Sequence, residues 1–434
     1  MASIYRQSTL TLAATGSKDG TGGLFSDNPE YKLIVTGPNG KQCNIYARKH
    51  IRHFGYPVGY EKRYPVIRVR DDSQDFPLLG RGWVYQERLL SKRMLHFGSG
   101  ERICECHEIH RTASDNVVDL MKTLKEGYML PLGQPRKWTR ETPWRLLVSQ
   151  YSTLRLTFGK DKLPALSGCA QQVLVDKYPT DPRNFSAQES PYVAGLWRKS
   201  LLDDLLWSAA DALLPRPEKW RAPSFSWASV DNVVKYPKRL SYQTGVEAEA
   251  EQYEPLCTVV GAEGIPSGID ITGAVRYGEL RIRGILMKGI LLHRPVHYLA
   301  EGFDGKDTVA YEPAKEFAYP PSVLLHEDKE LFFSADYALH CPGPHHVFPG
   351  ATIHVLRMQR PIDHNGPDYS LILRRVGEAQ VTPEEHQRLG ATYVQNGHKY
   401  ERIGLADISG ARVLDAQEKH QFRTRTEYTE VVII

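Results

Sequence analysis

The chain reads RGWVYQERLLSKRMLHF over residues 81–97. This stretch mixes arginine, glutamate and glutamine with large aliphatic and aromatic residues, which neither a plain core nor a plain surface requires. Its spacing predicts a short helix over Trp83–Leu90 and a strand over Arg93–Phe97. The turn Gly98-Ser99-Gly100 then leads into a second strand, Arg102–His107. The stretch therefore predicts a corner between a helix and a strand.

The charged residues of this stretch are candidates for a partly buried ionic cluster. A guanidinium offers a planar fork of donors that matches a carboxylate, so Glu87 is expected to pair with Arg81, Arg88 or Arg93. Such a cluster serves either the fold or catalysis, and both interpretations stay open. On the catalytic interpretation, the candidate catalytic residues are Arg81, Tyr85, Glu87, Arg88 and His96, and the candidate substrate-binding walls are Trp83 and Trp227.

The regions on either side of this stretch differ in pattern. Upstream, the turn Gly37-Pro38-Asn39-Gly40 predicts a β-hairpin of Lys32–Val35 with Cys43–Ala47. Downstream, residues 140–210 are expected to be mainly helical. The predicted helices begin at Thr142-Pro143, at Asp161 and at Trp197.

From about residue 224 onward, the pattern changes to runs rich in β-branched residues, separated by Gly, Pro and Asp. Many strands in one series favour antiparallel pairing. The predicted strands are Phe225–Val230, Thr258–Gly261, Glu279–Leu292, Glu330–Phe333, Thr352–Met358, Ser370–Val376, Tyr400–Leu405 and Thr424–Ile434.

These patterns predict an α+β fold class, predominantly antiparallel β. The sheet system is expected to close as a barrel or propeller, with an inserted helical segment. Three regions follow: residues 1–130 with hairpins, residues 131–222 with helices, and residues 223–434 with most of the strands. Because strands also occur near the start, residues 1–130 and 223–434 are candidates for sharing one closed sheet.

The charge balance limits the range of partners. The 434 residues include 55 Lys and Arg against 51 Asp and Glu, a net charge of +4, so no nucleic-acid partner is expected. No run approaches the roughly 18 apolar residues of a membrane span, so no membrane association is expected. The six cysteines are sparse and unevenly spaced, which favours reduced thiols and a cytoplasmic location. The oligomeric state stays open.

Two histidine-bearing segments are candidates for chemistry. Cys341–Gly350 combines proline, glycine and histidine in a long loop of the kind that builds pocket rims, so His345 and His346 are candidate substrate-binding residues. Cys104-Glu105-Cys106-His107, with His110, contains the residue types that bind zinc. Alternate strand residues share a face, so the two thiols are expected to fill a core, and no metal site is predicted.

Several common enzyme signatures are missing from the sequence. It has no Gly-Xaa-Ser-Xaa-Gly elbow, phosphate-binding loop or dinucleotide fingerprint. A hydrolase, kinase or dehydrogenase is therefore not expected, and no organic cofactor is predicted. The 23 tyrosines each offer an apolar ring with one hydroxyl, which suits a pocket for a small hydrophobic or aromatic substrate.

The 81–97 stretch resembles the closing motif of fungal heterokaryon-incompatibility (HET) domains, in which arginine and tryptophan precede glutamate, leucine and arginine. The family's N-terminal half would precede Ile4-Tyr5 and is expected to be missing here. Further segments that resemble the family are Ile4-Tyr5, Leu10–Ala14, Gly22–Phe25, Ile103–Cys106, Asp161–Gly168, Ala194–Trp197, Ala222–Val230 and Tyr400–Leu405.

Two functions are consistent with this resemblance. In the first, the protein is an enzyme of fungal specialised metabolism that reuses a HET-like scaffold. It would steer a dehydration, cyclisation or hetero-Diels-Alder cycloaddition of a polyketide or terpenoid intermediate, without a metal or organic cofactor. In the alternative, the protein regulates heterokaryon incompatibility or cell death through protein contacts. The expected lack of the signalling half favours the enzyme.

Overall fold

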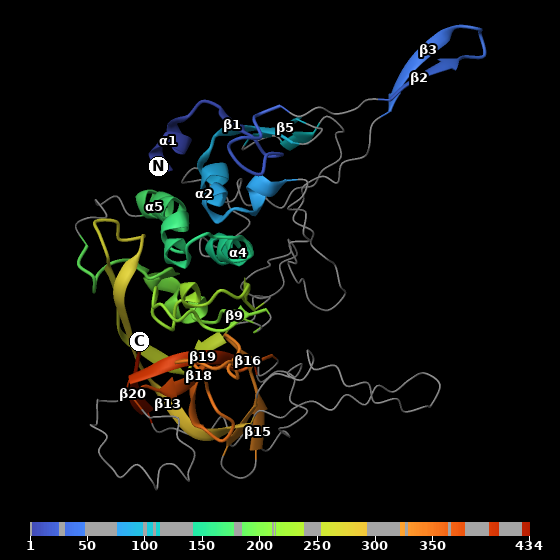
Figure 1. Cartoon of the computed structure of the whole chain (residues 1–434). Helices are drawn as coiled ribbons and strands as arrows, with labels where there is room; N and C mark the ends of the chain where they lie inside the picture. Colours follow the sequence, from blue (N-terminus) through green and yellow to red (C-terminus); the bar gives the residue numbers. More distant parts are fainter. Residues whose placement is uncertain are drawn as a thin grey trace, which may run out of the picture. The chain divides into compact units, whose positions relative to one another are not determined.

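The structure of the protein is a computed structural model, shown in Figure 1. The chain forms two compact units, Met1–Asp181 (unit 1) and Pro182–Ile434 (unit 2). The residues that the structure describes are 2–25, 31–47, 76–98, 102–106, 110–112, 142–177, 185–210, 212, 214–237, 253–292, 322–325, 329–362, 366–377, 399–407 and 428–434.

Unit 1 contains a four-stranded sheet with the order β1-β4-β5-β6. Strand β1 pairs parallel with β4, and the other neighbours pair antiparallel. The predicted corner is confirmed, because helix α2 (Gly82–Leu90) is followed after two residues by β4. The strands are β1 (Thr11–Ala13), β4 (Arg93–Phe97), β5 (Arg102–Cys106) and β6 (His110–Thr112).

The other helical elements of unit 1 include two of the predicted helices. Asp161 ends a short 3-10 turn ahead of helix α5 instead of capping the helix itself. The elements are α1 (Ala2–Gln7), η2 (Pro77–Gly80), α4 (Thr142–Tyr151), η3 (Gly159–Asp161) and α5 (Pro164–Lys177).

Helices α2 and α5 approach closely at Gly168. A Cβ atom there would lie 2.6 Å from the Ala2 Cβ and 2.7 Å from Gln86 Oε1, so only glycine leaves room for the contact. The same Gln86 oxygen accepts the Gly168 backbone N–H at 3.0 Å. A small residue and a buried amide thus set the packing of the two helices.

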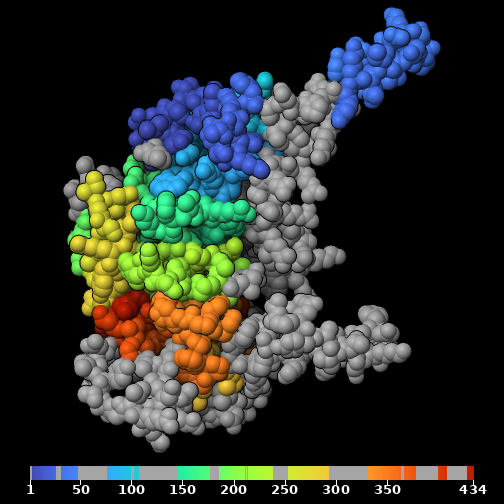
Figure 2. Space-filling model, in the orientation of Figure 1, coloured from blue at the N-terminus to red at the C-terminus, as the bar shows by residue number. Residues whose placement is uncertain are grey.

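The predicted hairpin is confirmed as β2 (Tyr31–Thr36) and β3 (Gln42–Ala47). Gly40 lies in the turn with a positive φ of 71°, which favours glycine. Register places Leu33 opposite Ile45 on one apolar face. Their side chains are exposed, and the hairpin is drawn in blue in the space-filling view of Figure 2.

The first part of unit 2 corrects two predictions. The helix expected from Trp197 is only the single turn α6, because Trp197 lies in a strand and the Asp204 carboxylate accepts its backbone N–H at 2.8 Å. The strand expected over Phe225–Val230 is a 3-10 turn, capped by Ser226 Oγ at 3.1 Å from the Ala228 N. The elements are β7 (Tyr192–Val193), β8 (Leu196–Trp197), η5 (Arg198–Ser200), α6 (Leu201–Asp204), β9 (Ser208–Ala209), η6 (Trp227–Ser229) and β10 (Val234–Lys235).

The rest of unit 2 is a ten-stranded sheet. Its neighbours pair antiparallel except β19 and β20, which pair parallel. The predicted strands from Thr258 onward are confirmed where the structure describes them; residues 424–427 of the last one lie outside the described residues. The strands are β11 (Tyr253–Pro255), β12 (Cys257–Pro266), β13 (Val275–Leu292), β14 (Ser322–Leu325), β15 (Lys329–Phe332), β16 (Ser334–Ala335), β17 (Thr352–Pro361), β18 (Tyr369–Arg375), β19 (Lys399–Asp407) and β20 (Tyr428–Ile433).

Strand β13 organises this sheet. It is 18 residues long, so its first half pairs with β12 and β20 while its second half pairs with β14 and β17. Over residues 280–283 it buries Leu280 and Ile282 and exposes Arg281 and Arg283, the alternation of a strand with one core face. The pairings β13–β17–β18–β19–β20–β13 form a cycle.

The described residues therefore confirm a β-rich, mostly antiparallel fold with a few helices. The three predicted regions stay a prediction; helices α4 and α5 belong to unit 1 and α6 to unit 2. The four-stranded sheet uses strands of unit 1, and the ten-stranded sheet uses strands of unit 2.

Candidate functional site

A pocket in unit 2 lies where the end of β18 and the start of β19 meet residues 338–350, which we call the histidine loop. Its volume is about 580 Å³, within the range of about 300–1,000 Å³ for small-molecule sites. The pocket includes His346, which the sequence singled out. The lining residues are Pro342, Gly343, Pro344, His346, Phe348, Arg374, Arg375, Val376, Gly377 and Glu401.

Arg374 and Glu401 form an ion pair at this pocket because β18 and β19 place them opposite each other. Arg374 Nε donates to Glu401 Oε2 at 2.6 Å, and Arg374 Nη2 lies 2.5 Å from the same oxygen. Burial would raise the pKa of Glu401, but the guanidiniums of Arg374 and Arg216 outweigh burial and hold this pKa below its ordinary value. Glu401 is therefore an ionised acceptor at the pocket.

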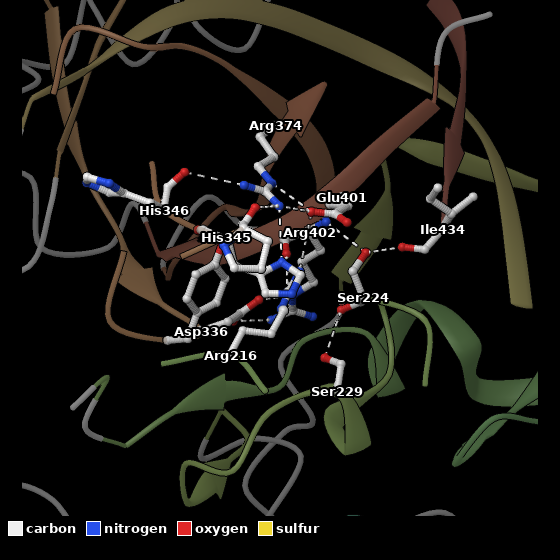
Figure 3. Close-up of polar contacts among 12 residues, drawn as sticks. Arg216, Ser224, Ser229, Asp336, His345, His346, Arg374, Glu401, Arg402 and Ile434 are labelled. Carbon is white, nitrogen blue, oxygen red and sulfur yellow. Dashed lines mark hydrogen bonds and ion pairs between the residues drawn. The ribbon is translucent and has the colours of Figure 1, made fainter. Parts of the chain in front are cut away.

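Arg374 also contacts the histidine loop, as Figure 3 shows. Its Nη2 lies 3.2 Å from His345 Nδ1. Its Nη1 and Nη2 donate to the backbone carbonyls of His346 and Pro344, each at 3.5 Å. Since a guanidinium only donates, His345 Nδ1 accepts and the imidazole carries its proton on Nε2. Burial first, and then the charge of Arg216, lower the pKa of His345 and favour this neutral ring.

Tyr337 and Arg216 support the same loop. The Tyr337 hydroxyl donates to the His345 carbonyl at 3.0 Å. The Arg216 guanidinium lies 4.5 Å from the centre of the Tyr337 ring and 3.6 Å from Glu401 Oε2. These contacts connect the loop to β19 through side chains that are largely buried.

A fully buried ion pair anchors β19 next to the site. Arg402 Nε and Nη2 donate to the two oxygens of Asp336 at 2.8 and 3.1 Å. The guanidinium also lies 3.7 Å from the centre of the Trp207 ring and donates to the backbone carbonyls of Leu205 and Trp207. Because both charged groups are fully buried, this pair serves the fold and is closed to substrate.

His346 and Phe348 form an aromatic wall of the pocket. Their rings lie 3.9 Å apart between centres, at 42°. The Phe348 side chain is exposed, so its ring offers a surface on which a flat molecule can stack.

The sequence motif of unit 1 forms a different kind of site. Arg88 pairs with Glu105 rather than with Glu87: Arg88 Nε lies 2.7 Å from Glu105 Oε2. His96 Nε2 lies 3.1 Å from the same oxygen, and His96 Nδ1 is hydrogen-bonded to Thr15 Oγ1 at 2.9 Å. All four residues are at most 2% exposed, so this polar group is part of the core.

Strand β5 presents the opposite face from the one expected. It buries Ile103 and Glu105, whereas Cys104 is exposed and Cys106 is half-buried. The prediction that the thiols fill a core is therefore wrong. The reason is that Arg88 and His96 stabilise the Glu105 carboxylate inside, and a buried carboxylate needs such partners.

The other motif residues have separate partners. The Tyr85 hydroxyl donates to Gln150 Oε1 at 3.0 Å, and the Trp83 indole N–H donates to Asp161 Oδ2 at 3.2 Å. Arg81 is exposed.

Glu87 is half-buried, and Tyr5 is its hydrogen-bond partner. Burial raises the pKa of Glu87 and outweighs the hydrogen bond from Tyr5 and the charge of Arg81, one of the three arginines expected to pair with it, which both lower this pKa. Burial and then the charge of Glu87 raise the pKa of Tyr5 to about 12.

Trp227 lies in the core of unit 2 rather than at the pocket. It is fully buried, and its indole N–H donates to the Gly195 carbonyl at 3.0 Å. Of the nine predicted site residues, only His345 and His346 lie at this pocket or next to it. The roles proposed for all nine stay predictions.

Sequence reasoning missed Arg374, Glu401 and Arg216. Two of them lie within predicted strands, Ser370–Val376 and Tyr400–Leu405, where a charged residue among apolar neighbours was a usable signal. Arg216 lies between elements and gave no signal of its own.

Comparisons with models of known protein families, with curated proteins and with solved structures found no match to this chain. The described residues hold no group of three or more His, Cys, Asp or Glu side chains arranged to bind a metal ion. Among the helices described, none is long and apolar enough to cross a membrane.

Proposed function

We propose that the protein is an enzyme of fungal specialised metabolism, related to HET-domain proteins, whose substrate is a small hydrophobic or aromatic molecule. It steers a dehydration, cyclisation or cycloaddition in the pocket of unit 2. The observation that carries the proposal is that one pocket of about 580 Å³ combines an aromatic pair with a guanidinium and a carboxylate.

The pocket residues supply the groups that such chemistry requires. A pocket that holds two reacting groups together lowers the barrier by several kcal/mol. A positioned donor such as Arg374, directed at a substrate carbonyl, contributes about 3 kcal/mol where water is excluded. His346 is the candidate for proton transfer, because it is the histidine among the described lining residues of the pocket.

The finer architecture belongs to the same proposal. We propose that the cycle of strands β13, β17, β18, β19 and β20 is a small closed barrel, supported by the unbroken series of pairings around it. Closure would hold β18 and β19 rigidly, and both carry charged residues of the pocket. Rigid elements are the better support for a catalytic site.

The test is to incubate the purified protein with intermediates made by enzymes encoded next to its gene and to compare product distributions and stereochemistry. The wild type is expected to change the products, and Arg374→Gln is expected to lower the rate by about 100-fold. Arg283→Gln is the matched control, since Arg283 is an exposed arginine on β13. If the products are unchanged with every intermediate, the proposed enzymatic function is contradicted.

The alternative, a regulator that acts through protein contacts, has one observation in its favour. The hairpin of β2 and β3 exposes Tyr31, Leu33, Val35 and Ile45, more apolar surface than a solvent-facing hairpin needs. If the protein is a regulator, its expression in a fungal host is expected to arrest growth. Leu33→Asp is then expected to abolish the growth arrest, and Arg374→Gln is expected to have no effect on it. Growth arrest that depends on Arg374 and not on Leu33 would support the enzyme instead.

A further inference from the structure

The charges at the pocket of unit 2 are unbalanced. Arg374 and Arg375 line it, whereas Glu401 is the only carboxylate among the described lining residues. Arg216 adds a third guanidinium 3.6 Å from Glu401. His345 next to the pocket stays neutral, because burial and Arg216 lower its pKa. The local charge therefore favours an anion.

The bonds of Arg374 differ in strength. Its contacts with Glu401 at 2.5 and 2.6 Å are short and charge-assisted. Its bonds to the carbonyls of Pro344 and His346, both at 3.5 Å, are at the outer limit of a hydrogen bond. An anionic oxygen is a stronger acceptor than these carbonyls, so it can replace them without breaking the pair with Glu401.

The aromatic wall lies in the same pocket. The rings of His346 and Phe348 lie 3.9 Å apart between centres and are tilted by 42°, and both residues line the pocket with Arg374. A flat ring that stacks on Phe348 would therefore bring an acidic substituent toward the guanidinium.

We propose that this pocket takes a planar aromatic anion, with its carboxylate, phenolate or sulfonate on Arg374 and its ring on the wall of His346 and Phe348. The proposal rests on the proposed function, because it names the substrate class of the same pocket. Glu401 keeps its pair with Arg374, and its negative charge repels the ligand, which lowers the affinity of the pocket for anions.

Two fluorescent probes test the proposal on the full chain. 1-Anilinonaphthalene-8-sulfonate is an aromatic anion, and N-phenyl-1-naphthylamine is the same ring system without the sulfonate. The anion is expected to bind the wild type about tenfold more tightly than the neutral probe. Arg374→Gln is expected to remove this preference while neutral binding stays the same, and Arg283→Gln is expected to leave both unchanged.

Two further variants separate ligand contacts from damage to the fold. Phe348→Ala changes an exposed side chain and is expected to lower the affinity for both probes at least fivefold. Glu401→Gln removes the carboxylate whose charge repels the ligand and is expected to tighten anion binding about threefold, a gain that a purely structural role of Glu401 would not produce. Circular dichroism confirms that each variant is folded.

The outcomes distinguish this proposal from the proposed function. The neutral probe could bind through Phe348 while the sulfonate brings no preference that depends on Arg374. That result would reject an aromatic anion as the ligand and leave the proposed enzymatic function of the pocket standing. If neither probe binds, or Phe348→Ala changes nothing, the pocket itself is rejected and both proposals fall.

Discussion

At the scale of single residues, Glu105 is the carboxylate that brings Arg88 and His96 together inside unit 1. Three polar groups from one helix and two strands meet there with almost no exposure to solvent. Burying a charge without its partner costs far more than the pair contributes. Glu105 is therefore required for the stability of unit 1 rather than for binding.

We predict that Glu105→Gln lowers the free energy of unfolding of unit 1 by about 3 kcal/mol, because Arg88 then loses the negative charge next to it. Urea unfolding measures the effect. Cys104→Ser, the exposed neighbour on β5, is expected to change it by less than about 0.5 kcal/mol. If Glu105→Gln lowers the free energy of unfolding as little as Cys104→Ser does, the ion pair of Arg88 and Glu105 does not contribute to stability.

The same residues show where a local pattern misleads. Alternation in β5 correctly separates two faces, one with two thiols and one with Ile103 and a carboxylate. The prediction placed the thiols inside because a carboxylate is costly to bury, and this selected the wrong face. Arg88 and His96 reverse the choice. Both were identified in the 81–97 stretch, yet the contact with Glu105 depends on the pairing of β4 with β5.

At the scale of elements, the histidine loop depends on a neutral His345. Its Nδ1 accepts from Arg374, and Arg216 and Glu401 are the other charged groups that face it. A protonated ring would place two positive charges 3.2 Å apart. The loop is thus held in place by the protonation state of one side chain.

We predict that the loop loosens in mild acid. The ordinary pKa of histidine is 6.5, and that of His345 in the folded protein lies below it. Above 6.5 the ring is neutral in both states, and the loop has its full stability. As the pH falls below 6.5 toward the folded pKa, the open state takes up the proton first, so stability is lost.

Hydrogen exchange of residues 338–350, corrected for the intrinsic rate at each pH, measures this loss between pH 7.5 and 5.5. His345→Gln keeps an acceptor but cannot take up the proton. The backbone amides of the histidine loop in this variant are therefore expected to exchange at the same corrected rate at both pH values. If the variant loosens as much as the wild type, another group is responsible.

At the scale of the whole molecule, each unit has its own buried ion pair. Arg402 and Asp336 lie in unit 2, and Arg88 and Glu105 lie in unit 1. In unit 2 the guanidinium connects β19 to the segment that follows β16 and to the carbonyls before β9. These partners are far apart in the sequence, so the pair secures the tertiary fold.

We predict that Arg402→Met destabilises unit 2 by about 3–5 kcal/mol, because it leaves Asp336 buried without its cation. Hydrogen exchange over the full chain is expected to rise in β17, β18 and β19 and to stay unchanged in α2, α5 and β4. Glu105→Gln is expected to give the reverse pattern. Uniform loss of protection with either variant would show that the two units unfold as one.

The sequence by itself determined the local elements: the α2–β4 corner, the β2–β3 hairpin, helices α4 and α5, and the β-rich second half. Each single helix, strand or turn among them follows from periodicity and turn residues over fewer than about 20 positions. Only the tertiary structure decided which charges meet. Arg374 and Glu401 are 27 residues apart, and Arg402 and Asp336 are 66 apart. The physical reason is that strand register and the burial of charge depend on partners distant in the sequence, which no local pattern contains.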